Sequence, residues 1–246
     1  MSAQQELPEM FTIYTDYQTA GRGQQGNSWE SEEGANLLFS TLFRLQDIPV
    51  QRQFLLSELV PLAMVEVLNK YATAFTIKWP NDIYWNDLKI GGILIEHILQ
   101  SNCLQRSIVG VGLNVNQTKF LSNAPNPTSL KQILCKDINR EVLLQEILDE
   151  FKVLRPLLHQ PESLKQRYMA HLYRRNGYHP YAETPCSAAP VNIAQHDLKG
   201  SFLATITDIT DNGCIVLTDK QGNPHTYHFK EIRYIIDRKS QQENAL

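Results

Sequence analysis

The sequence predicts an α+β protein: a mixed or antiparallel sheet with helices on one side, followed by a small β barrel. Two observations predict this class. The first part of the chain reads as strands and then helices rather than as strict β–α–β alternation, which favours helices segregated to one face of a sheet. After about residue 180, short strands alternate with tight-turn signals. We therefore expect two domains, 1–183 and 184–246.

The first strand is expected at 11–15, where FTIYT is rich in aromatic and β-branched residues. A long glycine-containing loop follows to Gly34, and 36–43 reads as the next strand. Apolar residues recur every three or four positions in 51–70, which predicts a buried helix. Pro61 should cap or kink this helix because it lacks an N–H donor.

Four further strands complete the expected sheet, and two helices follow a polar, proline-containing loop at 116–129. The strands are expected at 75–79, 82–85, 89–99 and 107–115, and the helices at 140–158 and 162–175. In 201–236, the turn sequences at 211–213 and 221–223 separate alternating runs typical of short strands. This segment predicts the small barrel.

The composition argues against a nucleic-acid-binding, membrane-spanning or disulfide-rich protein. The 246 residues carry a net charge of −3, which argues against broad nucleic-acid binding. No apolar run approaches the roughly 18 residues of a membrane span, and the N-terminus lacks the pattern of a signal peptide. The four cysteines are far apart, which predicts reduced, mostly buried thiols in a cytoplasmic protein rather than a disulfide or zinc framework.

The stretch GRGQQG, from Gly21 to Gly26, fits the dinucleotide-binding pattern G-x-G-x-x-G. That pattern requires a helix to begin within it, whereas the residues up to Gly34 show no helical repeat. We therefore reject a Rossmann site. The loop is either a surface turn or an anion cradle, in which backbone N–H groups and the guanidinium of Arg22 hold a phosphate.

Two other stretches concentrate unusual residues near strand ends. The run KWPND places Asn81 and Asp82 at a bend after Pro80, and Lys89 begins the next strand seven residues after Asp82. Spacing alone leaves open whether Asp82 and Lys89 face each other. Asn114 follows a glycine-interrupted strand and is either a strand-end residue or a ligand contact.

These stretches occur in the order QTAGRGQQGNSW, GANLLFS, KWPNDIYWNDLKIGGILIE and VGVGLNVN. The combination strongly resembles the biotin–protein ligase family, also called biotin–[acetyl-CoA-carboxylase] ligases, from about Tyr14 to Ile236. The resemblance implies a catalytic domain related in fold to class II aminoacyl-tRNA synthetases and a C-terminal SH3-like barrel. It also implies that ATP and biotin are the substrates and that Mg²⁺ is required. The implied partner is a biotin carboxyl carrier domain, and the ligase itself would be a monomer or homodimer.

The implied reaction has two steps. The biotin carboxylate attacks the α-phosphorus of ATP to give biotinyl-5′-adenylate and pyrophosphate. The amine of a carrier lysine then attacks this mixed anhydride and releases AMP. Two anions must meet in the first step, so cationic and N–H groups are needed where charge builds up.

The resemblance assigns catalytic roles to three residues. Lys89 would contact the biotin carboxylate and the α-phosphate, and Arg22 would close over biotin and the adenylate. Asp82 would face the phosphates and Mg²⁺. No other residue is assigned as a metal ligand. Further biotin contacts would come from Gln18, Gly21, Gly23 and Gly92. Further ATP contacts would come from Trp29, Asn81 and Asn114.

The sequence departs from the family pattern in two places. Gln24 stands where many members have an arginine that helps to retain the adenylate. No S-T-N motif, which forms part of the biotin pocket in the family, occurs in this chain. The first departure predicts weaker retention of the adenylate, and the second predicts a lower affinity for biotin. The absence of a helix-turn-helix segment predicts that no nucleic acid is bound.

Two alternatives are kept beside the ligase. A catalytically impaired protein that only binds biotin or the carrier would fit the absent S-T-N segment. A lipoate or octanoate ligase or transferase on the related fold is the other, although the KWPND run speaks against it.

Overall fold

A computed structural model describes residues 7–24, 28–100, 103–121, 126–184 and 200–236. The chain divides into two compact units, Met1–His171 and Leu172–Leu246. The first unit is built on a six-stranded sheet and the second on a five-stranded sheet. The α+β class is confirmed, with helix Phe54–Leu68 between strands Leu37–Arg44 and Phe75–Lys78 and the other helices of the first unit after strand Cys103–Leu113.

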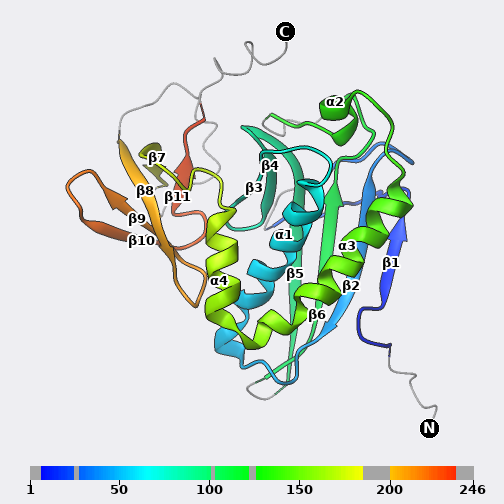
Figure 1. The fold of residues 1–246 in the computed structure, drawn as a ribbon, viewed down its shortest axis with the longest axis horizontal. Helices are drawn as coiled ribbons and strands as arrows, with labels where there is room; N and C mark the ends of the chain where they lie inside the picture. The colour runs from blue at the N-terminus through cyan, green and yellow to red at the C-terminus, as the bar shows by residue number, and fades with distance from the viewer. Residues whose placement is uncertain (1–6, 25–27, 101–102, 122–125, 185–199, 237–246) are drawn as a thin grey trace. The chain divides into compact units, whose positions relative to one another are not determined.

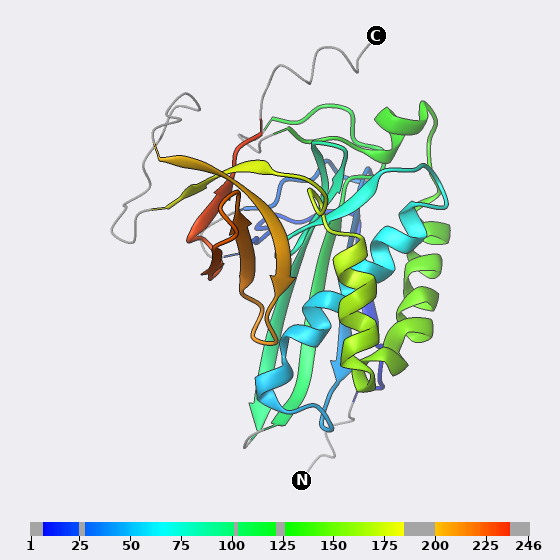
Figure 2. The ribbon, with the colours of Figure 1, turned by 60° about the vertical axis from the view of Figure 1, so that its left-hand side comes forward.

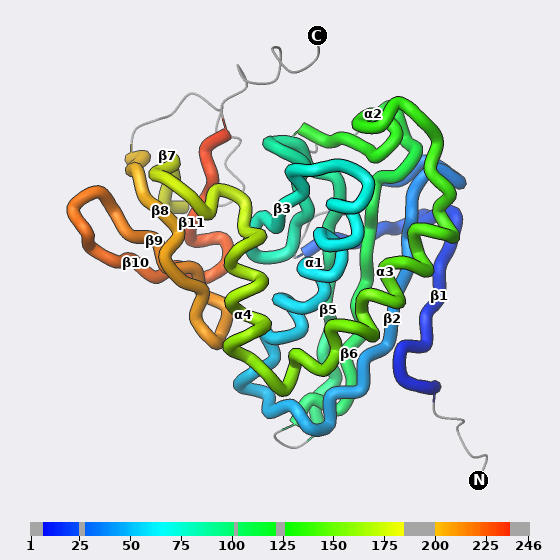
Figure 3. Tube along the Cα trace, in the orientation of Figure 1, coloured from blue at the N-terminus to red at the C-terminus, as the bar shows by residue number. Residues whose placement is uncertain are grey.

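The sheet of the first unit is antiparallel in every strand pairing. Its strands lie in the order β1-β2-β6-β5-β4-β3. Their bounds are Thr12–Thr15 (β1), Leu37–Arg44 (β2), Phe75–Lys78 (β3), Asp82–Trp85 (β4), Leu88–Gln100 (β5) and Cys103–Leu113 (β6). The two longest, β5 and β6, run side by side through the middle of the sheet (Figure 3).

Helices α1 (Phe54–Leu68), α3 (Arg140–Leu154) and α4 (Pro161–Ala170) cover one face of this sheet (Figures 1 and 2). The core forms where they meet it. Phe151 of α3 packs its ring edge against Phe43 of β2, with ring centroids 5.7 Å apart. No helix among the described residues is both long and apolar enough to cross a membrane.

Helix α1 does not end at Pro61, so the expected cap is wrong. The helix is buried on nearly all sides, and Leu59, Leu62 and Val65 are fully inaccessible. A helix-interior proline costs about 3 kcal/mol, whereas each fully buried apolar side chain contributes about 1.5–3 kcal/mol. Packing therefore outweighs the missing hydrogen bond.

Other differences concern helix ends and short elements. The short helix α2 (Leu130–Leu134) follows the predicted loop and begins at Ser129, whose side chain accepts a hydrogen bond from the Gln132 N–H. The helix expected at 140–158 ends at Leu154, because a 3₁₀ turn follows at Arg155–His159, and the helix expected at 162–175 is observed at Pro161–Ala170. Among the described cysteines, Cys103 and Cys135 are exposed and Cys214 is buried, so mostly buried thiols were wrongly expected; Cys186 lies outside the described residues.

The second unit holds an antiparallel sheet in the order β10-β9-β8-β7-β11. Its strands are His179–Glu183 (β7), Ser201–Ile209 (β8), Ile215–Asp219 (β9), Pro224–Tyr227 (β10) and Ile232–Tyr234 (β11). Both predicted tight turns are present, with Gly213 and Gly222 at positive φ. Tyr181 is fully buried against Tyr234, with ring centroids 5.0 Å apart.

The compact units divide earlier than the boundary expected between 183 and 184. Strand β7 lies before that position but pairs with β8 and β11. The reason is that β7 contains the fully buried Tyr181, which packs in the second unit.

Candidate active site

The β4–β5 hairpin brings two predicted site residues into contact. Lys89 Nζ lies 2.6 Å from Asp82 Oδ1, and both side chains are about one-fifth to one-quarter exposed. The register pairs Asp82 with Gly92 and Lys89 with Tyr84, and a β-bulge between Ile83 and Tyr84 shifts the pairing. A bulge re-aims side chains, which is how Lys89 reaches Asp82 across the hairpin.

A second lysine shares this carboxylate. Lys78 Nζ, at the end of β3, lies 3.9 Å from Asp82 Oδ2 and 5.1 Å from the ring centroid of Tyr84. Two ammonium groups thus flank one carboxylate in a partly buried place, where Coulomb interactions are stronger than in water. Such a place is suited to binding an anion.

A pair of glycines lies beside the charged cluster formed by Lys78, Asp82 and Lys89. Gly92 of β5 pairs with Gly112 of β6. The indole of Trp29 lies against both: a Cβ at Gly92 would come within 3.3 Å of the ring, and a Cβ at Gly112 would overlap it. The two glycines are therefore required for a flat group to lie on this part of the sheet.

The same glycine pair adjoins Asp82. A Cβ at Gly92 would lie 3.7 Å from Asp82 Oδ1. The flat surface formed by Gly92 and Gly112, called the glycine floor below, therefore adjoins the charged cluster. Trp29 Nε1 is buried there and has no hydrogen-bond partner in the part of the chain that the structure describes.

The glycine loop is held by its own backbone. The Trp29 N–H donates to the Gly21 carbonyl at 2.9 Å, and a Cβ at Gly21 would overlap the Trp29 carbonyl. The same Cβ would lie 2.9 Å from Gln18 Oε1, so these three residues are close together. Gly23 lies half-buried in the same segment. As expected, no helix forms in the described part of this loop, and β2 follows it.

Arg22 is not brought to the lysine cluster. Its guanidinium forms an ion pair with Glu96 of β5, with Nη2 and Oε2 3.2 Å apart. The two side chains are 71% and 51% exposed, so the pair contributes little to stability and can separate readily.

The two predicted amide residues make structural contacts. Asn81 Nδ2 donates to the Ile93 carbonyl at 2.5 Å, which joins the start of β4 to β5. Asn114 is buried, and its Nδ2 donates to the Thr128 carbonyl at 3.0 Å. The backbone of Lys89 is bonded to residues 126 and 128, so this segment lies beside Lys89.

Sequence reasoning missed Lys78, Gly112 and Glu96 as members of this site. Lys78 belongs to the KWPND run that was singled out, and Gly112 belongs to the glycine-interrupted strand, so both signals were present. Glu96 carried no such signal, because its partner is 74 positions away in the sequence.

No group of three or more His, Cys, Asp or Glu side chains suited to a metal is found among the described residues. Asp82, the predicted metal contact, is ion-paired with two lysines. Mg²⁺ is commonly held by one or two carboxylates together with substrate phosphates. Asp82 therefore fits a magnesium ion only when phosphate oxygens supply further ligands.

The described fold and site define an α+β protein in which Lys78, Asp82 and Lys89 form an ion-pair cluster beside the Gly92–Gly112 pair. A protein-family model described as the biotin/lipoate A/B protein ligase family matches residues 2–114. This part of the chain is similar to that family. The resemblance recognised from the sequence motifs is thereby confirmed.

Two curated relatives illustrate the similarity. The chain is 32% identical over 234 residues to the bifunctional ligase/repressor BirA of Bacillus subtilis, which covers 92% of this chain and 66% of that protein. It is 32% identical over 147 residues to the biotin–[acetyl-CoA-carboxylase] ligase of Mycobacterium tuberculosis, covering 57% and 52%. The chain thus spans less than two thirds of the length of these relatives.

Solved structures show the same fold at low sequence identity. The biotin protein ligase from Aquifex aeolicus, in complex with biotin and ATP, superposes with a TM-score of 0.72 at 22% identity. The match covers 94% of this chain and 92% of that one. Both units therefore have counterparts in a solved fold, and the β-rich second unit fits the expected SH3-like barrel.

Proposed function

We propose that this protein is a biotin–protein ligase that activates biotin with ATP and transfers it to a lysine of a carrier domain. The ion-pair cluster of Lys89, Asp82 and Lys78 beside the Gly92–Gly112 floor carries the proposal. The similarity to the biotin/lipoate A/B protein ligase family and the names of the relatives support it.

The first step joins two anions. An oxygen of the biotin carboxylate attacks the α-phosphorus of ATP, the bond to the bridging oxygen breaks, and pyrophosphate leaves. The barrier includes repulsion between the carboxylate and the phosphate, so fixed cations at the point of attack stabilise the transition state. Lys89 is the proposed cation at that point, with Lys78 behind the shared carboxylate.

Asp82 has two proposed roles. Without ligands it holds Lys89 at 2.6 Å and thereby fixes the direction of the ammonium group. With ATP bound, its carboxylate and the phosphate oxygens would hold Mg²⁺, which neutralises charge on the leaving pyrophosphate. The Asn81 amide, one residue away, would face the same phosphates.

The flat floor suits the ring system of biotin. Gly92 and Gly112 leave a space without side chains that the Trp29 indole fills in this structure, so the biotin ring would pack against the indole or displace it. Gln18, Gly21 and Gly23 lie in the segment that supports Trp29 and are the proposed contacts for the rest of the biotin pocket. Trp29 would also contact the adenylate, and Asn114 the adenine.

Arg22 would exchange its exposed partner for the ligand. Its ion pair with Glu96 is highly exposed, so breaking it costs little. The guanidinium would then close over the adenylate. In the second step, the carrier lysine attacks the anhydride carbonyl and AMP departs. The proposed acceptor is the biotin domain of a cytoplasmic carboxylase, and no nucleic-acid partner is proposed.

The test is biotin transfer from MgATP to a purified biotin carrier domain, read as a mass shift. Lipoate serves as a parallel donor because the family includes lipoate ligases. A mass increase with biotin alone supports the proposal. Transfer of lipoate in preference to biotin, or biotin binding without release of pyrophosphate, would overturn it in favour of one of the two alternatives.

A further inference from the structure

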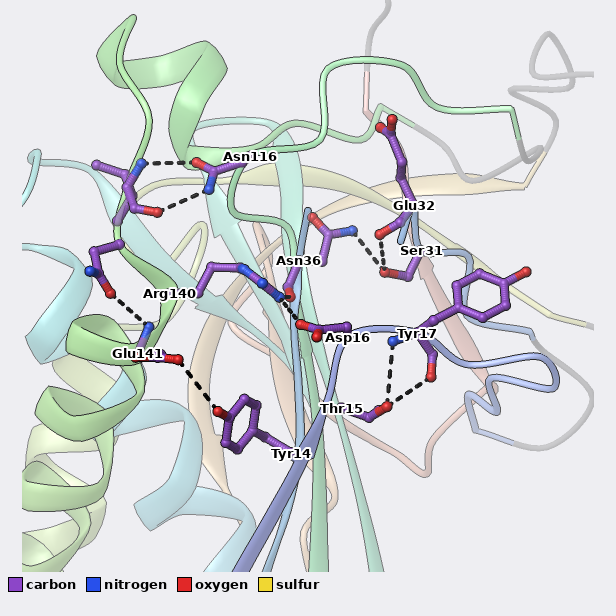
Figure 4. Close-up of polar contacts among 12 residues, drawn as sticks. Tyr14, Thr15, Asp16, Tyr17, Ser31, Glu32, Asn36, Asn116, Arg140 and Glu141 are labelled. Atoms are coloured by element: carbon purple, nitrogen blue, oxygen red, sulfur yellow. Dashed lines mark hydrogen bonds and ion pairs between the residues drawn. The ribbon is translucent and has the colours of Figure 1, made fainter. Parts of the chain in front are cut away.

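The polar network around Asn36 and Asn116 in the first unit is bonded within the chain. Arg140 donates to the Asn36 carbonyl at 3.0 Å and forms an ion pair with Asp16 at 2.9 Å (Figure 4). Asn116 forms two 2.9 Å hydrogen bonds with the backbone of Ile138. These side chains therefore stabilise the fold. The second unit contains a different kind of cluster, in which charged and aromatic groups line a hollow.

This hollow has a volume of about 430 Å³ and is formed by residues of the second unit. Its volume falls within the range of roughly 300–1,000 Å³ that is typical of ligand pockets. The residues that decide its chemistry are Glu183, Phe202, Asp219, Lys220, His225 and Tyr227. The hollow is therefore separate from the candidate active site, whose residues belong to the first unit.

The hollow lies where β10 and β7 approach each other, although β9 and β8 separate these two strands in the sheet. The Tyr227 hydroxyl of β10 donates a hydrogen bond to Glu183 Oε1 of β7 at 2.8 Å. The sheet must curl for this bond to form. Both residues line the hollow, so the curl brings together groups from strands that are not neighbours.

Three aromatic rings form one side of the hollow, called the aromatic wall below. Phe202 comes from β8, and His225 and Tyr227 come from β10. The rings of His225 and Tyr227 are stacked with centroids 6.4 Å apart. The Phe202 ring lies 6.2 Å from that of Tyr227 and 6.3 Å from that of His225. The faces of Phe and Tyr rings attract cations within about 6 Å, so the aromatic wall is suited to a cationic group.

A carboxylate lies beside each of the two rings of β10. Glu183 accepts the hydrogen bond from the Tyr227 hydroxyl, and Asp219 Oδ2 lies 3.4 Å from His225 Nε2. Hydrogen bonds in the β9–β10 turn, first of all the bond from the Asn223 backbone N–H, lower the pKa of Asp219 to about 2. Asp219 therefore stays ionised at neutral pH. A cation on the aromatic wall would lie near carboxylate oxygens.

Lys220 also lines the hollow and carries the opposite charge. Its ammonium group lies 6.0 Å from the ring centroid of Tyr178. Lys220 would repel a bound cation and attract a bound anion. The sign of the ligand's charge can therefore be tested by removing this ammonium group.

We propose that this hollow binds the guanidinium group of an arginine side chain presented by a partner protein. A guanidinium is flat, so it can stack on the aromatic wall while its N–H groups donate to Glu183 or Asp219. A lysine ammonium has no flat face and is more strongly hydrated, so it fits less well. The inference uses residues of the second unit and does not depend on biotin or ATP.

The arginine is better supplied by a protein than as the free amino acid. Free arginine would bring its own α-carboxylate toward Glu183 and Asp219, whereas a protein segment has neutral amides at that position. Leu203, which is 41% exposed, lines the same hollow and offers an apolar contact to a neighbouring residue of such a segment.

The experiment is a titration of the full chain, followed by NMR of the histidine and tyrosine ring signals. The probes are the blocked tripeptides acetyl-Gly-Arg-Gly-amide and acetyl-Gly-Lys-Gly-amide, together with free arginine. We expect the arginine peptide to shift the signals of His225 and Tyr227 and to bind about fivefold more tightly than the other two probes. Equal binding of the three probes, or no shift at these two rings, would overturn the inference. Tighter binding of free arginine would overturn the protein partner.

Two variants should change the affinity for the arginine peptide in opposite directions. Glu183→Gln keeps an oxygen for the Tyr227 hydroxyl but removes the charge, and it should raise the Kd about fivefold. Lys220→Gln should lower the Kd about twofold, because it removes a repelling charge. Glu162→Gln, a substitution of the same kind at an exposed position of α4, is the control and should leave the Kd unchanged.

An unchanged Kd in Glu183→Gln, or weaker binding in Lys220→Gln, would contradict a cationic ligand. Thermal unfolding shows whether each variant is folded. If Glu183→Gln does not fold, Lys220→Gln and the wild-type titration still decide the question. The titration contains neither biotin nor ATP, so its result is independent of the biotin-transfer assay.

Discussion

Lys89 Nζ lies 2.6 Å from Asp82 Oδ1, although the strand register places Gly92, not Lys89, opposite Asp82. The β-bulge between Ile83 and Tyr84 makes this possible, because it adds a residue to one strand and turns the side chains that follow. The Lys89–Asp82 contact is therefore a product of an irregularity in strand pairing.

Lys89→Ala should abolish most of the activation step. The substitution removes the cation placed where two anions meet, and loss of one such electrostatic group costs roughly 10²–10³-fold in kcat. Pyrophosphate release with biotin and MgATP measures the effect. Lys152→Ala, which breaks an exposed pair with Asp149, is the control and should retain wild-type rates. Wild-type turnover by Lys89→Ala would remove this lysine from the mechanism.

Gly112→Ala should displace Trp29. The added methyl group would overlap the indole, so the ring must leave the floor. We expect a shift in tryptophan fluorescence and a loss of biotin affinity of at least tenfold. Gly110→Ala is the matched control two residues away on the same strand, where the new Cβ has only an ordinary 3.5 Å contact. Equal effects of the two substitutions would mean that biotin affinity depends on the strand in general and not on the space at Gly112.

Tyr168→Phe should not destabilise the first unit. Tyr168 of α4 is completely buried, and its hydroxyl has no hydrogen-bond partner within the described residues. Removing an unsatisfied buried hydroxyl should leave the free energy of unfolding within about 1 kcal/mol of wild type, or raise it. Tyr168→Ala, which also removes the ring, should cost about 3–5 kcal/mol. Urea unfolding measures both; a large loss in Tyr168→Phe would reveal a partner for the hydroxyl.

The β9–β10 turn should carry an acid-dependent contribution to stability. Hydrogen bonds lower the pKa of Asp219 from 3.8 to about 2, first of all the bond from the Asn223 backbone N–H. A lowered folded-state pKa stabilises the fold above the unfolded value, and this contribution disappears as pH falls through the folded value.

The Tm difference between wild type and Asp219→Asn should therefore be constant above pH 5 and shrink as pH falls from about 4 toward 2. Thermal unfolding at a series of pH values measures it. Asp211→Asn, in the neighbouring exposed turn, controls for the loss of one surface charge. A difference independent of pH would contradict the proposed role of these hydrogen bonds.

Most of the elements could be predicted because their signals are local. The aromatic and β-branched residues of 11–15 predict a strand, and the three-to-four-residue spacing of apolar residues in α1 predicts a buried helix, from neighbouring residues alone. The rejection of a Rossmann turn at GRGQQG was correct for the same reason, since a missing helical repeat is visible in the sequence. Pro61 was expected to cap or kink α1, and the cap was wrong because the burial that keeps the helix continuous through Pro61 is a tertiary property.

The sequence by itself determined the α+β class, the two-part organisation and the motifs that identify the family. Only the tertiary structure decided which of those residues meet. It joined Lys89 to Asp82 through a bulge, placed Trp29 on Gly92 and Gly112, and paired Arg22 with Glu96. The physical reason is that strand register, bulges and contacts between distant segments depend on the summed packing of the whole sheet, whereas periodicity and turn chemistry depend on a few adjacent residues.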